Sequence, residues 1–139
     1  MTVPPLGPVL ETALYVDDLP RAAAFFSRVF GLTAMFENER LQAFDAGPGS
    51  VLLLFARGGS TADMPMPGGT IPGHDGAGRS HMAFAIGAGE VDAWRDHLAR
   101  EGVAIGSEVR WPKGGHSLYF DDPDGHVLEL ATPGLWANY

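Results

Sequence analysis

The hydrophobic and polar positions of the chain run through the same order of elements twice. Residues 9–16 alternate as a β-strand does and lead into Asp17-Asp18-Leu19-Pro20, an acidic N-cap with a proline near the first helical turn. Apolar residues then recur at helical spacing up to Gly31, a residue typical of a helix C-terminus. Three β-like runs follow over 34–38, 41–46 and 51–56. The first half therefore predicts the order β-α-β-β-β.

The second half predicts the same order. It contains a strand pattern over 80–86, a helix pattern over 90–100 and further strand patterns over 105–109, 117–120 and 127–131. The connection over 57–79 is rich in glycine and proline and has no sustained periodicity, so we interpret it as a linker, a lid, or both. We predict one domain over residues 1–139, made of two modules at roughly 7–57 and 79–133, joined by the loop 57–79.

The two faces of the predicted strands differ in character. Side chains alternate between faces along a strand, and in three strands one face is bulky and apolar while the other carries Glu11, His81 or Glu129 among mostly small residues. If the bulky faces pack on the helices, the other face has room for a ligand. Two carboxylates and an imidazole are costly to dehydrate alone, and a divalent cation would satisfy all three. The alternative is a solvated face on which the three residues never meet.

Composition narrows the class of protein. Apolar residues make up 45% of the chain and charged residues 19%, which is typical of a globular protein. The net charge of −8 and the scattered lysines and arginines disfavour nucleic acid and anionic lipid as partners. The lack of cysteine excludes disulfides, thiolate zinc sites and cysteine nucleophiles. The longest apolar run, 51–56, is too short for a bilayer and the start has no basic region, so we expect a soluble, cytoplasmic protein.

Several further residues are candidates for a substrate pocket. His116 follows a flexible Gly114-Gly115 turn and is equally well interpreted as an exposed loop histidine. His74, in the glycine-rich loop, would approach a site only if that loop closes as a lid. Aromatic residues that could line an apolar pocket, or belong to the core, are Trp111, Phe55 and Tyr15. The aromatic tail over 135–139 predicts docking on the body of the protein or on a second subunit, and we expect a homodimer.

Three stretches carry a family resemblance that covers nearly the whole chain. They are 10–19 with the Phe25-Phe26 helix and Gly31-Leu32, then 78–84, and the closing run 117–130 with its Asp122-Pro123-Asp124-Gly125 turn. The sequence resembles the vicinal oxygen chelate superfamily, which includes glyoxalase I, bleomycin resistance proteins, fosfomycin resistance enzymes and extradiol dioxygenases. The resemblance implies an α+β fold in which two βαβββ modules form a curved mixed sheet around a metal, with ligands from the first and last strands of the modules.

The resemblance places the ligand positions on Glu11, His81 and Glu129. The fourth position falls on Leu53, which cannot coordinate a metal, so it implies three protein ligands with positions left for water and a bidentate substrate. Two carboxylates and one imidazole suit a divalent ion such as Mn, Fe, Zn, Ni or Co without choosing among them.

The run that contains Tyr119 and Glu129 is also similar to half of the extradiol dioxygenase signature. Residues 110–112 lack the histidine of the other half, and Glu11 stands where that group has another histidine. We therefore rank ring cleavage lower and keep Tyr119 as a candidate pocket residue.

Two functions remain open. The first is a metal-dependent lyase, isomerase or transferase, or less plausibly a dioxygenase, that chelates a small oxygen-rich substrate and stabilises an oxyanion or enolate, with Glu129 or Glu11 as a base. The second is a dimer of the bleomycin-resistance type that sequesters a small ligand without chemistry. The three ligand-type residues favour the first.

Overall fold

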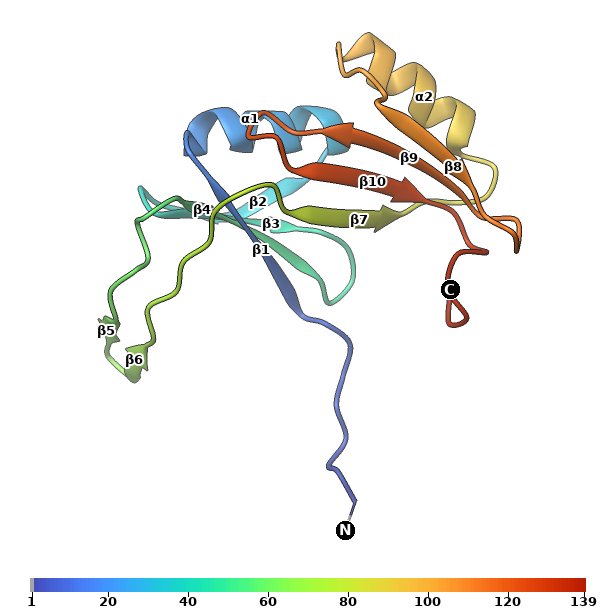
Figure 1. The fold of residues 1–139 in the computed structure, drawn as a ribbon. Helices are drawn as coiled ribbons and strands as arrows, with labels where there is room; N and C mark the ends of the chain where they lie inside the picture. Colours follow the sequence, from blue (N-terminus) through green and yellow to red (C-terminus); the bar gives the residue numbers. More distant parts are fainter. Residues whose placement is uncertain (1) are drawn as a thin grey trace. The chain divides into compact units, whose positions relative to one another are not determined.

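The chain folds into two compact units. The computed structural model describes residues 2–139, and the boundary between the units falls after Ala77. Each unit holds one helix and one four-stranded mixed sheet (Figure 1). The prediction of an α+β fold with two βαβββ modules is confirmed.

The first unit contains the helix and the four strands that the sequence pattern predicts. Its elements are β1 (Glu11–Val16), α1 (Leu19–Phe30), β2 (Thr33–Glu37), β3 (Leu41–Asp45) and β4 (Val51–Ala56). The strand order is β1-β4-β3-β2, with β1 parallel to β4 and the other pairs antiparallel. The pairing of β2 with β3 is interrupted by a register shift between Ala34 and Phe36. The first strand therefore lies beside the last strand of its own module.

Helix α1 has the ends that its sequence predicts. The Asp18 side chain accepts a hydrogen bond from the Arg21 backbone N–H at 3.1 Å, and a proline stands in the first turn. Gly31 ends the helix in the left-handed conformation with φ of 66°, where its N–H donates to the Ser27 carbonyl. The buried face of α1 includes Phe26 and Val29 and packs on β3 and β4. These contacts form the core of the first unit.

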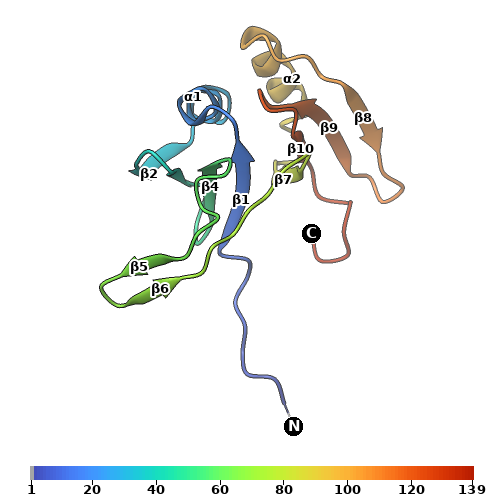
Figure 2. The same ribbon diagram turned by 60° about the vertical axis from the view of Figure 1, so that its left-hand side comes forward.

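A small β-hairpin lies within residues 57–79, the connection for which the sequence pattern predicted neither a strand nor a helix. It consists of β5 (Met64–Met66) and β6 (Gly69–Ile71), which pair antiparallel and extend from the first unit (Figure 2). Three-residue strands are too short to show a period of two, which is why the sequence did not predict them. The His74 N–H donates to the Ser60 carbonyl at 2.8 Å, so the two ends of the hairpin segment meet.

The second unit repeats the topology of the first. Its elements are β7 (His81–Ala85), α2 (Val91–Arg100), β8 (Ser107–Arg110), β9 (His116–Asp121) and β10 (Val127–Ala131). The strand order is β7-β10-β9-β8, with β7 parallel to β10. The C-terminal tail docks on this unit, because the Tyr139 hydroxyl donates to the Ala131 carbonyl at 2.8 Å. Docking on the body, the first alternative for the tail, is therefore confirmed.

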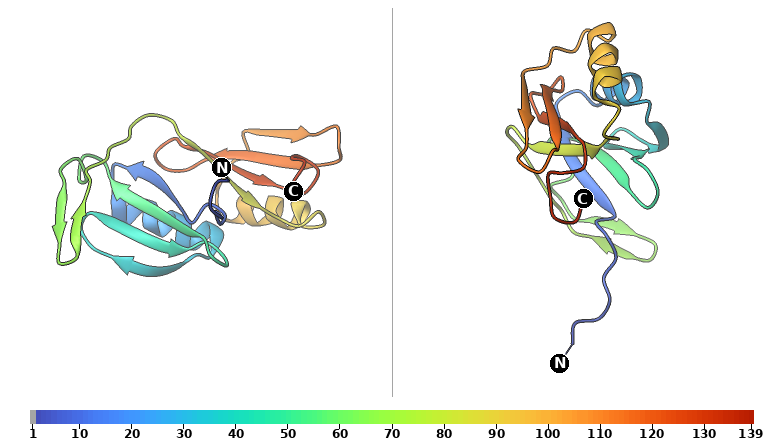
Figure 3. Two further views of the ribbon diagram at one scale, coloured as in Figure 1. Left: turned by 90° about the horizontal axis from the view of Figure 1, so that it is seen from below. Right: turned by 90° about the vertical axis from the view of Figure 1, so that its right-hand side faces the viewer.

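The faces of both sheets divide as the alternation predicts. In each unit the helix lies across one face of its own sheet (Figure 3). The fully buried apolar strand residues all belong to one alternate set, and they are Leu14, Val16, Phe44, Leu52 and Leu54 in the first unit and Leu118, Phe120, Leu128 and Leu130 in the second. The other set is more exposed and carries most of the candidate site residues. Among the described residues, neither helix has the length and hydropathy to cross a bilayer.

Candidate functional site

The strand registers make the site positions of the two units comparable. Glu11 pairs with Val51 across the parallel strands of the first unit, and His81 pairs with Val127 in the second. Glu129 lies two residues beyond Val127, and Leu53 lies two residues beyond Val51. The first-strand positions are therefore occupied by Glu11 and His81, and the last-strand positions by Leu53 and Glu129.

His81 and Glu129 come together on the site face of the second unit. The His81 Nε2 atom lies 3.2 Å from the Glu129 Oε1 atom. The Glu129 side chain is 5% exposed, whereas that of His81 is 53% exposed. The pair thus joins a buried carboxylate to an imidazole that solvent or a ligand can reach.

The second oxygen of Glu129 is held by a chain of hydrogen bonds. Ser117 Oγ lies 2.5 Å from Glu129 Oε2, and Trp111 Nε1 lies 2.8 Å from Ser117 Oγ. An indole N–H can only donate and a carboxylate can only accept. The Ser117 hydroxyl therefore accepts from Trp111 and donates to Glu129.

The backbone determines which nitrogen of His81 carries a proton. His81 Nδ1 lies 2.9 Å from the Val127 carbonyl oxygen, which can only accept, so Nδ1 is the donor. In the neutral imidazole, Nε2 then presents its lone pair toward Glu129 Oε1. Two acceptors at this distance repel each other unless a proton or a metal cation binds there. The arrangement therefore fits a divalent cation with one nitrogen and one carboxylate oxygen as ligands.

Tyr119 lines the same face. Its ring stacks with that of His81, with centroids 6.2 Å apart and planes at 29°. Burial, followed by the negative charge of Glu129 and a hydrogen bond to it, raises the pKa of the Tyr119 phenol. The phenol therefore stays protonated at neutral pH and donates its hydrogen to Glu129.

The remaining predicted ligand lies in the first unit. Glu11 is exposed and shares one face of its sheet with Leu53, Tyr15 and Phe55. Within either unit, the described residues bring no three histidine, aspartate or glutamate side chains together as metal ligands. The role of Glu11 as a third ligand stays a prediction.

His74 is a candidate that the sequence did not favour and that the structure brings to this face. Its Nδ1 atom lies 2.5 Å from the Tyr15 hydroxyl oxygen, and its ring meets that of Phe55 edge-on with centroids 4.5 Å apart. Gly76 passes so close to the Tyr15 ring that a Cβ there would lie 2.3 Å from Tyr15 Cδ2. Only a glycine fits at this crossing, and the glycines of 73–78 were the one signal in the sequence for such an approach.

His116 lies on the helix-side face of the second sheet, unlike Glu129. Its neighbours along β9 on that face, Leu118 and Phe120, are buried, and its Nε2 atom lies 3.4 Å from Glu108 Oε1. Arg95 also pairs with Glu108, and this contact, followed by His116, lowers the pKa of the Glu108 carboxyl. A depression of about 320 Å³ adjoins His116 here. The alternation of β9 thus places His116 and the Ser117–Glu129 contact on opposite sides of the sheet.

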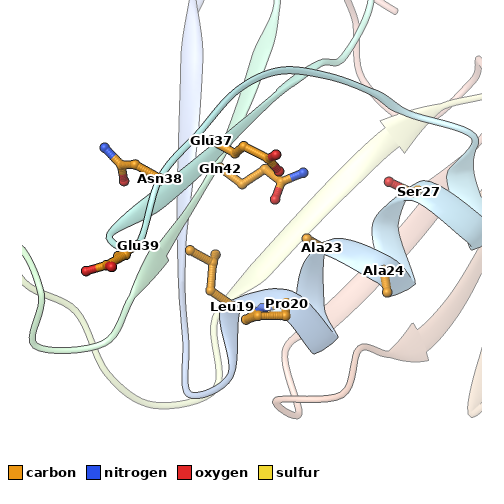
Figure 4. Close-up of a pocket in the computed structure, with 9 residues that line it drawn as sticks. All are labelled: Leu19, Pro20, Ala23, Ala24, Ser27, Glu37, Asn38, Glu39 and Gln42. Carbon is orange, nitrogen blue, oxygen red and sulfur yellow. The ribbon is translucent and has the colours of Figure 1, made fainter.

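A groove of about 810 Å³ opens on the first unit between α1 and the β2–β3 hairpin. Its apolar side is formed by residues of α1 such as Leu19 and Ala23, and its polar side by Glu37, Glu39 and Gln42 (Figure 4). None of the predicted site residues lines this groove. The groove is therefore separate from the candidate site.

The family model and the similar proteins agree on one superfamily for this chain. A family model described as Glyoxalase/Bleomycin resistance protein/Dioxygenase superfamily matches residues 9–130. The chain is 31% identical over 136 residues to a probable lactoylglutathione lyase of Vibrio parahaemolyticus, with 89% of each chain covered. It is 31% identical over 121 residues to the metallothiol transferase FosB of Lysinibacillus sphaericus, covering 86% of this chain and 78% of FosB.

A solved structure agrees over almost the full length. The lactoylglutathione lyase from Agrobacterium tumefaciens superimposes with a TM-score of 0.87 at 36% sequence identity. The match covers 97% of this chain and 99% of that one. The likeness therefore includes both units and the segment that joins them.

Proposed function

Because the chain belongs to the glyoxalase, bleomycin resistance protein and dioxygenase superfamily, we propose that it is a metal-dependent enzyme that acts on a small substrate bound through two oxygen atoms. The relatives support the enzymatic interpretation over the sequestering one, because the curated relatives and the solved structure named above carry the names of lyases and transferases. The prediction of a metal-dependent enzyme of this superfamily is thus confirmed at the level of its relatives.

The observation that carries the proposal is the pairing of His81 with Glu129. Nε2 and Oε1 are directed at one another 3.2 Å apart, while each group uses its other polar atom in a hydrogen bond of its own. Metal-bound histidines are commonly oriented by such a bond from the second ring nitrogen to a carbonyl. We propose His81 and Glu129 as two protein ligands of a divalent ion and Glu11 as the third.

The divalent ion, when bound, would act as a Lewis acid on the substrate oxygens. The residues of the chain have separate tasks around it. Ser117 orients the Glu129 carboxylate, because its hydroxyl donates to Oε2. Tyr119 places a neutral phenol against Glu129, on the face where the substrate would bind. Glu11, an exposed carboxylate, is our candidate for the base that takes a proton from the substrate, with Glu129 as the second candidate.

Lactoylglutathione is the first substrate to test. Two relatives that match at least 89% of this chain, one curated and one solved, carry the name lactoylglutathione lyase. Thiol transfer is the second reaction to test, on the name of FosB. A metal site with three protein ligands would leave open positions for either substrate.

We also propose that the protein is a cytoplasmic homodimer. A dimer interface would cover the apolar side chains that the chain ends expose, among them Leu6, 96% exposed, and Trp136, 68% exposed. The lack of cysteine is compatible with a reducing compartment. Sedimentation equilibrium of the wild type against a variant in which Trp136 and Leu6 are both replaced by serine tests the dimer. A wild type that sediments as a monomer contradicts it.

The metal content of the purified protein tests the central proposal. Wild-type protein prepared without chelator or histidine tag should contain about one equivalent of a transition ion by elemental analysis. We expect E129Q and H81A to lose it and E11Q to hold it more weakly. E39Q, a substitution of an exposed glutamate on the helix side, is the matched control and should load like the wild type.

A wild type that stays free of metal after reloading contradicts the metal site and favours the ligand-sequestering alternative. An E11Q variant that matches the wild type in metal affinity removes Glu11 from the ligand set and leaves His81 and Glu129 in place.

A further inference from the structure

We propose that Trp111 and Ser117 are positioning residues for the metal, which act by holding Glu129 so that it binds through Oε1 alone. The inference rests on the proposed function, because it assigns the task of two residues that lie behind a proposed ligand. Their hydrogen bonds lead to Glu129 Oε2, whereas the oxygen that faces His81 is Oε1. Their effect is transmitted through the carboxylate.

The direction of the hydrogen bonds follows from the chemistry of the groups. Trp111 Nε1–H donates to Ser117 Oγ at 2.8 Å, and the serine has one hydrogen, which it gives to Glu129 Oε2 at 2.5 Å. The indole N–H thus fixes the direction in which the hydrogen of the Ser117 hydroxyl points. Since Oε2 is engaged in a charge-assisted hydrogen bond, Oε1 is the oxygen left to face His81.

The inner of the two hydrogen bonds is buried, and the outer one is anchored by the backbone around Trp111. Ser117 is fully buried and Glu129 is 4% exposed, so bulk water does not replace the bond between them, while the Trp111–Ser117 bond is half-buried. Trp111 opens a tight turn in which its N–H donates to the Gly115 carbonyl at 2.8 Å and its carbonyl accepts from the Gly114 N–H at 2.9 Å. Gly115 in turn packs against Gly134, where a Cβ would lie 2.8 Å from a backbone carbon. The indole is therefore held by a rigid loop.

The first unit shows that the fold does not require these polar groups. Leu41 pairs with Phe55 in the first unit as Ser117 pairs with Ala131 in the second, and Leu53 stands where Glu129 stands. Two leucines thus occupy the positions of the serine and the glutamate in a sheet of the same order. A buried carboxylate with its own donor is costlier than that apolar pair, which indicates a role in binding and not in folding.

Metal affinity measures the proposed role directly. We expect S117A and W111F to bind Mn²⁺ or Zn²⁺ about 10- to 100-fold more weakly than the wild type, the usual effect of removing a group that orients a ligand. S117T, which keeps the hydroxyl, should restore affinity to within a few-fold. W94F, a change at the tryptophan of α2, is the control for W111F. The measurement is competition for each ion with a chromogenic chelator, with far-UV circular dichroism of the metal-free proteins as the check on folding.

The double variant S117L/E129L copies the apolar pair of the first unit. It should fold with a wild-type circular dichroism spectrum and bind neither ion. If S117A and W111F both bind the ions as tightly as the wild type, the positioning role is wrong while the metal site stands. If S117A binds weakly and W111F does not, the indole has no part in the chain and the inference is overturned for Trp111. If the wild type itself binds neither ion, the proposed function and this inference both fail.

Discussion

Replacing Gly76 with alanine tests whether the glycine-rich segment is fixed against the sheet of the first unit. In the structure a Cβ at position 76 would lie 2.3 Å from Cδ2 and 2.5 Å from Cε2 of Tyr15. Carbon atoms in contact are about 3.5 Å apart, so the ring or the segment must retreat by about 1 Å. The Tyr15 ring cannot do so freely, because it stacks on Phe55 and its hydroxyl meets His74 at 2.5 Å.

The cost of G76A has two parts. Overpacking costs about 1–3 kcal/mol. A retreat of about 1 Å also stretches the Tyr15–His74 hydrogen bond beyond its normal range, which costs about 0.5–1.5 kcal/mol more. We therefore expect the free energy of unfolding to fall by roughly 2–4 kcal/mol. G68A is the matched control, because a Cβ at Gly68 meets nothing within 4 Å.

Urea unfolding followed by tryptophan fluorescence and circular dichroism gives both free energies. The same substitution in a Y15A background should cost much less than in the wild type, since the ring that it meets is gone. If G76A and G68A unfold at the same urea concentration, the segment moves aside without cost and its fixed position over Tyr15 is wrong.

Three further substitutions test particular contacts. D18A should destabilise the protein by about 1 kcal/mol in urea unfolding, because the hydrogen bond to the Arg21 N–H is lost. D18N keeps an acceptor and should be close to neutral, and equal destabilisation by the two variants would contradict the role of Asp18 as the helix cap. Y139F should cost about 1 kcal/mol in the same assay through loss of the bond to Ala131, and no change would mean that the tail is undocked. Burial raises the pKa of the Asp122 carboxyl against the opposing effect of the His126 N–H, so its stabilising contribution is present at acid pH and is lost as pH rises through the raised pKa. The wild type should therefore gain stability relative to D122N between about pH 7 and about pH 4, and a constant difference would contradict this.

The sequence predicted the fold well because its local signals agree with its long-range ones. The cap at Asp18, the stop at Gly31 and the alternation of buried leucines along β4 and β10 each indicate one element at one place. The hairpin formed by β5 and β6 escaped prediction because its strands are three residues long. Three positions are too few to show the alternation of a β-strand.

The candidate site was predictable in its residue types and less so in its contacts. Alternation put Glu129 and His81 on the same face, which their contact at 3.2 Å bears out. The alternation of β9 also assigns His116 to the opposite face, but the strand was predicted to begin at 117, which left His116 in the preceding loop. The hydrogen bond from Trp111 to Ser117 and the return of His74 to Tyr15 depend on loop paths, which no periodic pattern encodes.

The division of each strand into two alternate sets also bears on how such a protein changes over generations. Along β10 the residues that hold the unit together, Leu128 and Leu130, are neighbours in sequence of Glu129 but share no face with it. A mutation on the site face therefore alters what the protein offers to a small molecule and leaves the buried leucines as they were. Mutations on the site face can thus give the protein new chemistry with little loss of its ability to fold. Libraries randomised at positions 81, 119 and 129 should therefore retain more folded members than libraries randomised at 118, 128 and 130.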